Sequence, residues 1–244
     1  MRDRFAIYHN GETGHNALSV FGIFRGFRCH NYSNAVERVL FPSIVETVKG
    51  SYMFENHMRN LIYKKFSNFD EVLLRQGAED SLCGAMVLIA IRASGRIMIA
   101  NMGDSQVVVS TENTEKLLFS SPNKVEEVTR KIVNDGGSVS KVNNVWNIEG
   151  IFPSSRGLGV AKFKTKQWIK GTPLFQEIDM KEVGSSSVAM ISTGSVFSVI
   201  NISDSFSTIF ENRKKKYFGA KQLVQDARRK NPVDNLSVMI VKLL

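Results

Sequence analysis

The sequence predicts one α+β domain with sheets in the middle and helices outside. Strand-like runs and helical patterns interleave along the whole chain, and no linker rich in Pro, Gly or Ser divides it. Most of the strand-like runs are continuously apolar, which predicts strands that are covered on both faces. The chain has 244 residues and is 43% hydrophobic, so disordered and collagen-like classes are excluded.

Seven runs are predicted as strands, and the turns between them suggest how three of them pair. The runs are Phe5–Tyr8, Ser19–Phe24, Ala85–Ile91, Ile97–Asn101, Gln106–Ser110, Val188–Ser192 and Leu236–Lys242. The tetrapeptide Ala93–Arg96 forms a tight turn between two runs, and Gly103-Asp104 joins the next pair. We therefore expect an antiparallel meander from Ala85 to Ser110.

Helical patterns fill the intervals between the strands. The predicted helices run from Tyr32 to Val48, from Met53 to Leu74, from Ser121 to the Gly136-Gly137 pair, from Ser203 to Phe210 and from Ala220 to Arg229. Pro42 should kink or divide the first of them, because proline removes a helical N–H. Ser203 is the expected N-cap of the fourth.

The charge of the chain raises the question of nucleic-acid binding. There are 32 Lys+Arg against 23 Asp+Glu, which gives a net charge of +9 and a pI of about 9.6. The positive charge concentrates at Arg213–Lys216 and Arg228–Lys230, and no zinc-finger or aromatic RNA-binding signature accompanies it. A solvated basic face is the favoured interpretation over a nucleic-acid site.

Cysteines and hydropathy predict an intracellular protein, in the cytoplasm or the nucleus. Cys29 and Cys83 are too few for a disulfide framework and are interpreted as ordinary small residues in a reducing compartment. No apolar run reaches the roughly 18 residues that span a bilayer. The polar stretch from Met1 to Asn16 does not resemble a secretory signal, so no membrane association is expected.

Three carboxylates lie at ends of predicted strands. Asp3 precedes the first run, Asp104 follows the fourth, and Asp234 comes before the last. Carboxylates that converge in this way can bind a hard cation such as Mg²⁺. The alternative is that each one caps a turn, which is the favoured interpretation for any one of them alone.

Seven short segments form an ordered set along the chain. They are Met1–Phe5, Val20–Arg28, Ile99–Ser105, Asp135–Val139, Val145–Gly159, Ile191–Gly194 and Asp234–Val238. Together they resemble the signature segments of the metal-dependent serine/threonine protein phosphatases (PPM, type-2C), and the plant members most of all. The resemblance implies a single domain over residues 1–244, beginning at the family's Met-Glu-Asp segment. It also implies a four-layer α-β-β-α sandwich of two antiparallel sheets flanked by helices. The implied activity is hydrolysis of phosphoserine and phosphothreonine by a water that bridges two Mg²⁺ or Mn²⁺ ions.

The chain departs from the family pattern at the implied metal site. The positions that still carry ligand-related groups are Asp3, Asp104, Asp234 and the backbone carbonyl of Gly26. Five positions are degenerate. Arg2 replaces the Glu of Met-Glu-Asp, Arg25 replaces the bridging Asp, and Phe27 replaces a His credited as general acid. Val160 replaces the Asp that ends Leu-Gly-Asp, and Thr193 replaces the Asp of Ser-Asp-Gly.

These departures predict a pseudophosphatase that binds no metal. We expect Arg25 to pair with two of the three carboxylates, although it could instead be a drifted surface residue. By analogy within the family, the expected partner is a kinase or a phosphoprotein. Two other functions remain open, an atypical active phosphatase with one metal on Asp3, Asp104 and Asp234, and a basic nucleic-acid-binding module. The chain could also be a decaying gene product.

Overall fold

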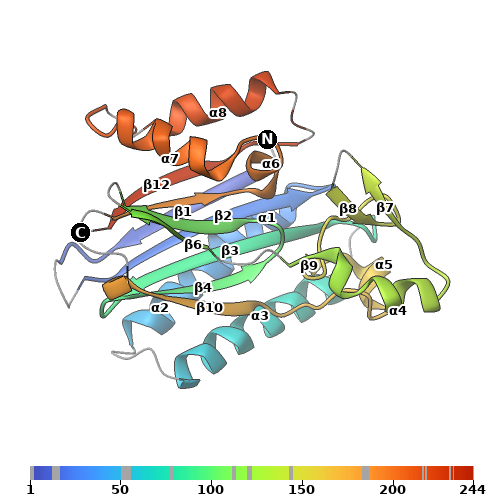
Figure 1. Cartoon of the computed structure of the whole chain (residues 1–244). Coiled ribbons are helices and arrows are strands. Elements are labelled where there is room, and N and C mark those ends of the chain that lie inside the picture. Colours follow the sequence, from blue (N-terminus) through green and yellow to red (C-terminus); the bar gives the residue numbers. More distant parts are fainter. Residues whose placement is uncertain are drawn as a thin grey trace.

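In a computed structural model of the chain, two antiparallel sheets lie between two layers of helices (Figure 1). The structure describes residues 3–12, 17–50, 56–76, 80–111, 114–119, 123–142, 145–182, 187–215, 217, 219–230, 232 and 234–243. Helices α1 to α3 cover one sheet, and α7 and α8 cover the other (Figure 1). The predicted four-layer α+β architecture is confirmed.

The first sheet carries the beginning of the chain. Its strand order is β1-β2-β3-β4-β10, with β9 paired to β3, and all pairs are antiparallel. The strands are β1 (Asp3–His9), β2 (Ser19–Phe27), β3 (Gly84–Ala93), β4 (Arg96–Met102), β9 (Leu158–Gly159) and β10 (Leu174–Asp179). In the register of β1 and β2, Asp3 lies opposite Arg25, so two predicted site residues sit at one end of this sheet.

The second sheet is built from the later strands, in the order β12-β11-β5-β6. The strands are β5 (Gln106–Thr111), β6 (Thr114–Phe119), β11 (Ser187–Ser192) and β12 (Val238–Leu243). A separate antiparallel hairpin joins β7 (Val139–Val142) to β8 (Val145–Ile148).

The predicted meander from Ala85 to Ser110 is wrong in its second half. β3 and β4 pair as predicted, but β5 pairs with β11 in the other sheet. Gly103 between β4 and β5 has φ +148°, and a Cβ there would lie 2.6 Å from Met86. Glycine therefore allows a close, strongly bent crossing from one sheet to the other, and Asp104 lies at that crossing.

The helices follow the predicted ranges with some changes at their ends. They are α1 (Asn31–Ala35), the π-helical η2 (Val36–Leu40), α2 (Phe41–Lys49), α3 (Asn56–Gln76), the 3₁₀ turn η3 (Val125–Glu127), α4 (Thr129–Asn134), α5 (Ala161–Lys164), the 3₁₀ turn η4 (Met180–Glu182), α6 (Gly194–Phe197), α7 (Ile202–Glu211) and α8 (Ala220–Arg229). The predicted starts at Met53 and at Ser121-Pro122 lie outside the described residues.

Two predictions about helix ends have different outcomes. Pro42 does divide its helix, because α2 restarts after a π-helical turn with Pro42 in its first turn, where no N–H is needed. Ser203 is not the N-cap of α7. Asn201 has the extended backbone of an N-cap, and its side chain accepts a hydrogen bond from the Ser203 N–H at 2.8 Å.

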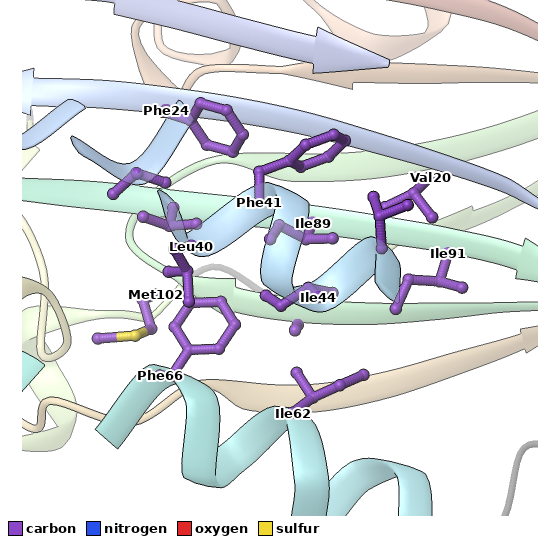
Figure 2. Close-up of a cluster of buried hydrophobic side chains, with 14 of the residues drawn as sticks. Val20, Phe24, Leu40, Phe41, Ile44, Ile62, Phe66, Ile89, Ile91 and Met102 are labelled. Atoms are coloured by element: carbon purple, nitrogen blue, oxygen red, sulfur yellow. The ribbon is translucent and has the colours of Figure 1, made fainter. Parts of the chain in front are cut away.

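The central strands are buried on both faces, as their continuous apolar runs predict. Val87, Ile89 and Ile91 of β3 pack with the helical layer, whereas Leu88 and Ala90 pack between the two sheets. Figure 2 shows the first of these clusters, in which side chains of α2 and α3 meet the sheet. This packing makes the sheets a rigid support for the loops at their ends.

Candidate functional site

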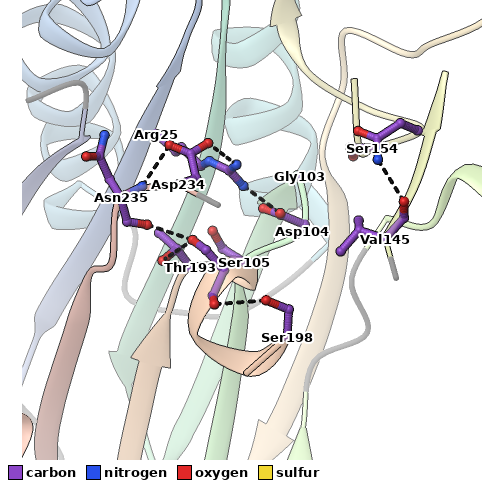
Figure 3. Close-up of polar contacts among 12 residues, drawn as sticks. Arg25, Gly103, Asp104, Ser105, Val145, Ser154, Thr193, Ser198, Asp234 and Asn235 are labelled. Atoms are coloured by element: carbon purple, nitrogen blue, oxygen red, sulfur yellow. Dashed lines mark hydrogen bonds and ion pairs between the residues drawn. The ribbon is translucent and has the colours of Figure 1, made fainter. Parts of the chain in front are cut away.

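Four segments that are distant in sequence meet at one end of the sandwich. They are the end of β2 with Arg25, the crossing from β4 to β5 with Asp104, the segment before β12 with Asp234, and the start of β1 with Asp3. Asp104 and Asp234 converge on Arg25 of β2, as Figure 3 shows, and Asp3 lies opposite Arg25 in the ladder of β1 and β2.

The Arg25 guanidinium joins two of the carboxylates. Its Nη1 donates to Asp104 Oδ2 at 2.6 Å, and its Nη2 donates to Asp234 Oδ2. The side chain is buried. Burial acts to lower the pKa of Arg25, but the charges of Asp104 and Asp234 outweigh it and hold the pKa above its usual value. Arg25 is therefore a permanently charged link between the two sheets, and the interpretation as a drifted surface residue is wrong.

Asp3 lies beside this link without bonding to it. Its Oδ2 accepts a hydrogen bond from Ser237 Oγ at 2.8 Å. Its Oδ1 is buried and has no hydrogen-bond partner among the described residues, as is also true of Asp104 Oδ1. Burial raises the pKa of Asp3, while the Ser237 hydroxyl and the charge of Arg25 act to lower it.

Thr193 belongs to a network of neutral hydrogen bonds. Its hydroxyl group hydrogen bonds with the Ser195 hydroxyl, the two oxygens lying 3.2 Å apart, and accepts from the Ser237 N–H at 3.2 Å. Ser195 Oγ donates to the Asn235 carbonyl oxygen at 2.6 Å. The network ties the end of β11 to the segment before β12, and its side chains contribute no carboxylate.

Two other positions at which the chain departs from the family pattern lie in apolar surroundings. The Phe27 ring meets Phe152 edge-on, with ring centroids 5.0 Å apart. Val160 is fully buried in the same cluster and has a left-handed backbone with φ +51°. Left-handed backbone is unusual for a β-branched residue, so packing holds Val160 in place against its local preference.

The two remaining predicted site positions are Gly26 and Arg2. Gly26 is buried in β2 opposite Ala85, next to Arg25. Arg2 lies outside the described residues.

A cleft opens beside the Arg25 link. It encloses about 190 Å³. Arg25, Phe27, Asp104 and Asp234 line one side, and the β7–β8 hairpin with the loop after it lines another. The sequence did not predict this hairpin wall, nor the part that Ser195 plays in the site, although serines cluster directly after the buried strand β11.

The donor set at this end of the sandwich fits a guanidinium better than two divalent cations. Asp104 and Asp234 each direct an oxygen to Arg25. Across the ranges that the structure describes, no group of three or more His, Cys, Asp or Glu is placed to hold a metal ion. A buried positive charge that two carboxylates already neutralise stands where the resemblance implies the bridging ligand.

A membrane-spanning helix must be long and apolar along its whole length. None of the described helices is both long enough and apolar enough to cross a bilayer.

Comparison with known sequences gives one consistent result. The family model described as "Protein phosphatase 2C" matches residues 1–236. "Probable protein phosphatase 2C 2" of Arabidopsis thaliana is 26% identical over 252 residues, which cover 100% of this chain and 64% of that protein. "Protein phosphatase 1L" of Bos taurus is 24% identical over 251 residues, which cover 99% and 68%. The chain thus spans about 64% of the length of the plant relative.

Two solved structures share the fold of this chain. A serine-threonine phosphatase 2C from Toxoplasma gondii superposes with a TM-score of 0.78 at 18% identity, covering 99% of this chain and 90% of that one. A C. elegans sex determining protein also gives a TM-score of 0.78, at 19% identity, covering 98% of this chain and 60% of that one.

Proposed function

The chain belongs to the protein phosphatase 2C family, and we propose that it is a member without metal-dependent catalysis that acts by binding a protein. The observation that carries this proposal is the buried Arg25 guanidinium bonded to Asp104 and Asp234.

Electrostatics gives the reason that Arg25 opposes metal binding. A unit positive charge about 4 Å from a divalent cation repels it by roughly 8 kcal/mol at an effective dielectric constant of about 20. That repulsion corresponds to nearly six powers of ten in affinity at about 1.4 kcal/mol per power of ten. To admit the cations, Arg25 would also have to leave a buried position where both of its carboxylate partners are already in place.

The other replaced positions support the same proposal. Thr193 offers a neutral hydroxyl that is already hydrogen bonded, and Val160 offers no ligand atom. Phe27 has no proton to give a leaving group, so general acid catalysis from that position is lost as well. Each change removes a different part of the hydrolytic machinery that the resemblance implies.

A domain that keeps the phosphatase fold without its chemistry keeps a surface that proteins can bind. We propose a kinase or a phosphoprotein as the partner, because a phosphatase domain of this family acts on phosphoproteins. The cleft beside Arg25, with one apolar wall and one charged wall, is the proposed contact region.

A second candidate is an atypical phosphatase that holds one metal ion. Asp3 Oδ1 and Asp104 Oδ1 are buried without hydrogen-bond partners among the described residues, and such oxygens are suitable ligands for a hard cation. The nucleic-acid alternative has no such observation in its favour, and the matched family gives it no support.

A phosphatase assay separates these candidates. The purified protein is incubated with a phosphothreonine peptide in millimolar Mn²⁺, and released phosphate is measured. The proposal predicts no turnover above that of the buffer. Turnover that disappears in Asp234→Ala and persists in Asp226→Ala, a half-exposed aspartate on α8, would instead establish the second candidate.

A restored variant tests the same claim from the other side. Arg25→Asp combined with Thr193→Asp returns two carboxylates to the site, and calorimetry with Mn²⁺ should then detect binding that the unchanged protein lacks. If the unchanged protein binds Mn²⁺ as tightly as the restored variant does, the proposal is wrong.

A further inference from the structure

Two thiols that the proposed function does not use lie together near the cleft. The chain has two cysteines, Cys29 just after β2 and Cys83 just before β3. β2 and β3 are neighbours in the sheet, with Phe27 opposite Gly84. The register therefore places Cys29 and Cys83 at the same end of two paired strands, and Cys29 is one of the groups that act on the Cys83 thiol. The interpretation of both as ordinary small residues rests on the local sequence of each, which does not indicate that strand pairing brings the two segments together.

A tight turn brings Cys29 back toward β3. The Cys29 N–H donates to the Phe27 carbonyl oxygen at 2.7 Å, and Arg28 between them has φ +63°. This is a γ-turn with positive φ, a rare and strained conformation. The turn ends β2 abruptly, at the point where Phe27 pairs with Gly84 at the start of β3.

Cys83 is fixed in place by contacts of its own. Its N–H donates to the Asp80 carbonyl oxygen at 2.9 Å, and its carbonyl oxygen accepts from the Val160 N–H at 2.8 Å. The Arg28 Nε lies 3.6 Å from Asp80 Oδ2, so an ion pair also links the two segments that carry the cysteines. The segments that carry the two cysteines are thus held together by strand pairing and by this ion pair.

The two thiols differ in their access to solvent. Cys29 is partly exposed and Cys83 is buried. Burial, together with the neighbouring Cys29, raises the pKa of the Cys83 thiol to about 12. A reagent in solution therefore reaches Cys29 first, and Cys83 is placed to react with whatever forms on Cys29.

We propose that Cys29 and Cys83 are a redox-modification site that reacts with low-molecular-weight disulfides such as glutathione disulfide to give an intramolecular disulfide. The Cys29 thiolate attacks one sulfur of glutathione disulfide, the S–S bond breaks, and one glutathione thiolate leaves. Cys83 gives its proton to solvent, attacks the Cys29 sulfur of the mixed disulfide and releases the second glutathione. The protein loses two electrons and two protons, and glutathione disulfide becomes two glutathione thiols.

The disulfide would act on the cleft through the backbone. It would tie the end of β2, two residues beyond Phe27, to the start of β3, and Cys83 is in turn hydrogen bonded to Val160. This inference does not depend on whether the site beside Arg25 binds metal.

Thiol trapping with mass spectrometry tests the proposal. The reduced protein is incubated with glutathione disulfide, free thiols are trapped with N-ethylmaleimide, and the intact mass and the peptides are measured. We expect the wild-type protein to lose two hydrogens, to take up no N-ethylmaleimide, and to yield a peptide containing Cys29 linked to one containing Cys83. Dithiothreitol should restore both thiols.

The two serine variants identify the order of the steps. Cys83→Ser should stop with one glutathione on Cys29, and Cys29→Ser should gain glutathione more slowly by about tenfold or more, because Cys83 is buried. Near-ultraviolet circular dichroism checks that each variant is folded. A wild-type protein that keeps glutathione on Cys29, or that links two molecules together, would overturn the proposal. That result needs no variant, so misfolding of a variant cannot obscure it.

Discussion

Replacing Arg25 with Ala tests whether the guanidinium holds the two sheets together at the candidate site. The side chains of Arg25, Asp104 and Asp234 are 8%, 17% and 32% exposed. Removing one member of a buried ion pair costs about 3–5 kcal/mol, because a charge is left without its partner. Asp234 is partly screened by solvent, so the expected loss for Arg25→Ala is about 3 kcal/mol, mostly from Asp104.

Urea unfolding followed by tryptophan fluorescence measures this loss, since Trp168 is fully buried. For a domain of this size the melting temperature should fall by roughly 6–12 °C. Arg75→Ala is the matched control. Arg75 pairs with Glu71 at 3.4 Å, but these side chains are 81% and 58% exposed, so the change should be within about 0.5 kcal/mol.

A rescue experiment separates lost charge compensation from lost packing. Adding Asp104→Asn and Asp234→Asn to Arg25→Ala removes the carboxylates that lack a counter-charge, and part of the stability should return. If Arg25→Ala is as stable as Arg75→Ala, then Arg25 is not a structural cation and the electrostatic reasoning fails.

Three other predictions concern the rest of the chain. In reducing buffer, burial raises the pKa of the Cys83 thiol to about 12 in the folded protein. The folded protein therefore keeps a proton that the unfolded chain releases above about pH 9. The free energy of unfolding measured in urea titrations should therefore fall from about pH 9 upward. In Cys83→Ala it should fall less steeply, by up to about 1.4 kcal/mol per pH unit, and equal slopes for the two proteins would contradict this. Gly194→Ala places a Cβ 2.5 Å from the Asp104 carboxyl group and should cost about 1–3 kcal/mol in urea unfolding. In the control Gly50→Ala the added Cβ has no neighbour nearer than 3.7 Å, so no such loss of stability is expected. Equal urea midpoints for the two variants would refute the clash at Gly194. Duplex DNA and RNA should not bind at about 100 mM salt in fluorescence anisotropy, whereas steeply salt-dependent binding would favour the nucleic-acid alternative.

Much of the fold could be predicted from patterns that depend on neighbouring residues. Continuous apolar runs such as that of β3 identify strands buried on both faces, and α8 is bounded as its pattern predicts. The pairing of β5 could not be predicted in this way. The short turn at Gly103 suggests a hairpin, but only the packing of the second sheet on the first shows that the chain crosses there.

The elements that the sequence did not predict carry weak local signals. β9 has two residues and depends on its pairing with β3. β10 is half-buried along most of its length and mixes apolar with charged residues, so neither alternation nor a continuous apolar run marks it. Pro42 predicts that the helix is kinked or divided, but not that the turn before it is π-helical.

At the candidate site, too, part of the arrangement could be predicted from the sequence and part depends on tertiary structure. That Arg25 would pair with carboxylates follows from charge and from the position of the strand ends. Which two carboxylates it would choose depends on tertiary geometry, since Asp3 lies opposite Arg25 in the ladder but bonds to Ser237 instead. That Cys29 and Cys83 come to the same end of two paired strands could not be predicted for the same reason, because it depends on the pairing of β2 with β3.

The central claim is that Arg25 fills the place of divalent cations, and crystals soaked in Mn²⁺ test it most directly. Anomalous scattering locates each bound Mn²⁺ without reference to activity. The account predicts no anomalous peak beside Asp104 and Asp234, with Arg25 bonded to both. Two strong peaks next to these carboxylates, with Arg25 displaced from them, would contradict it.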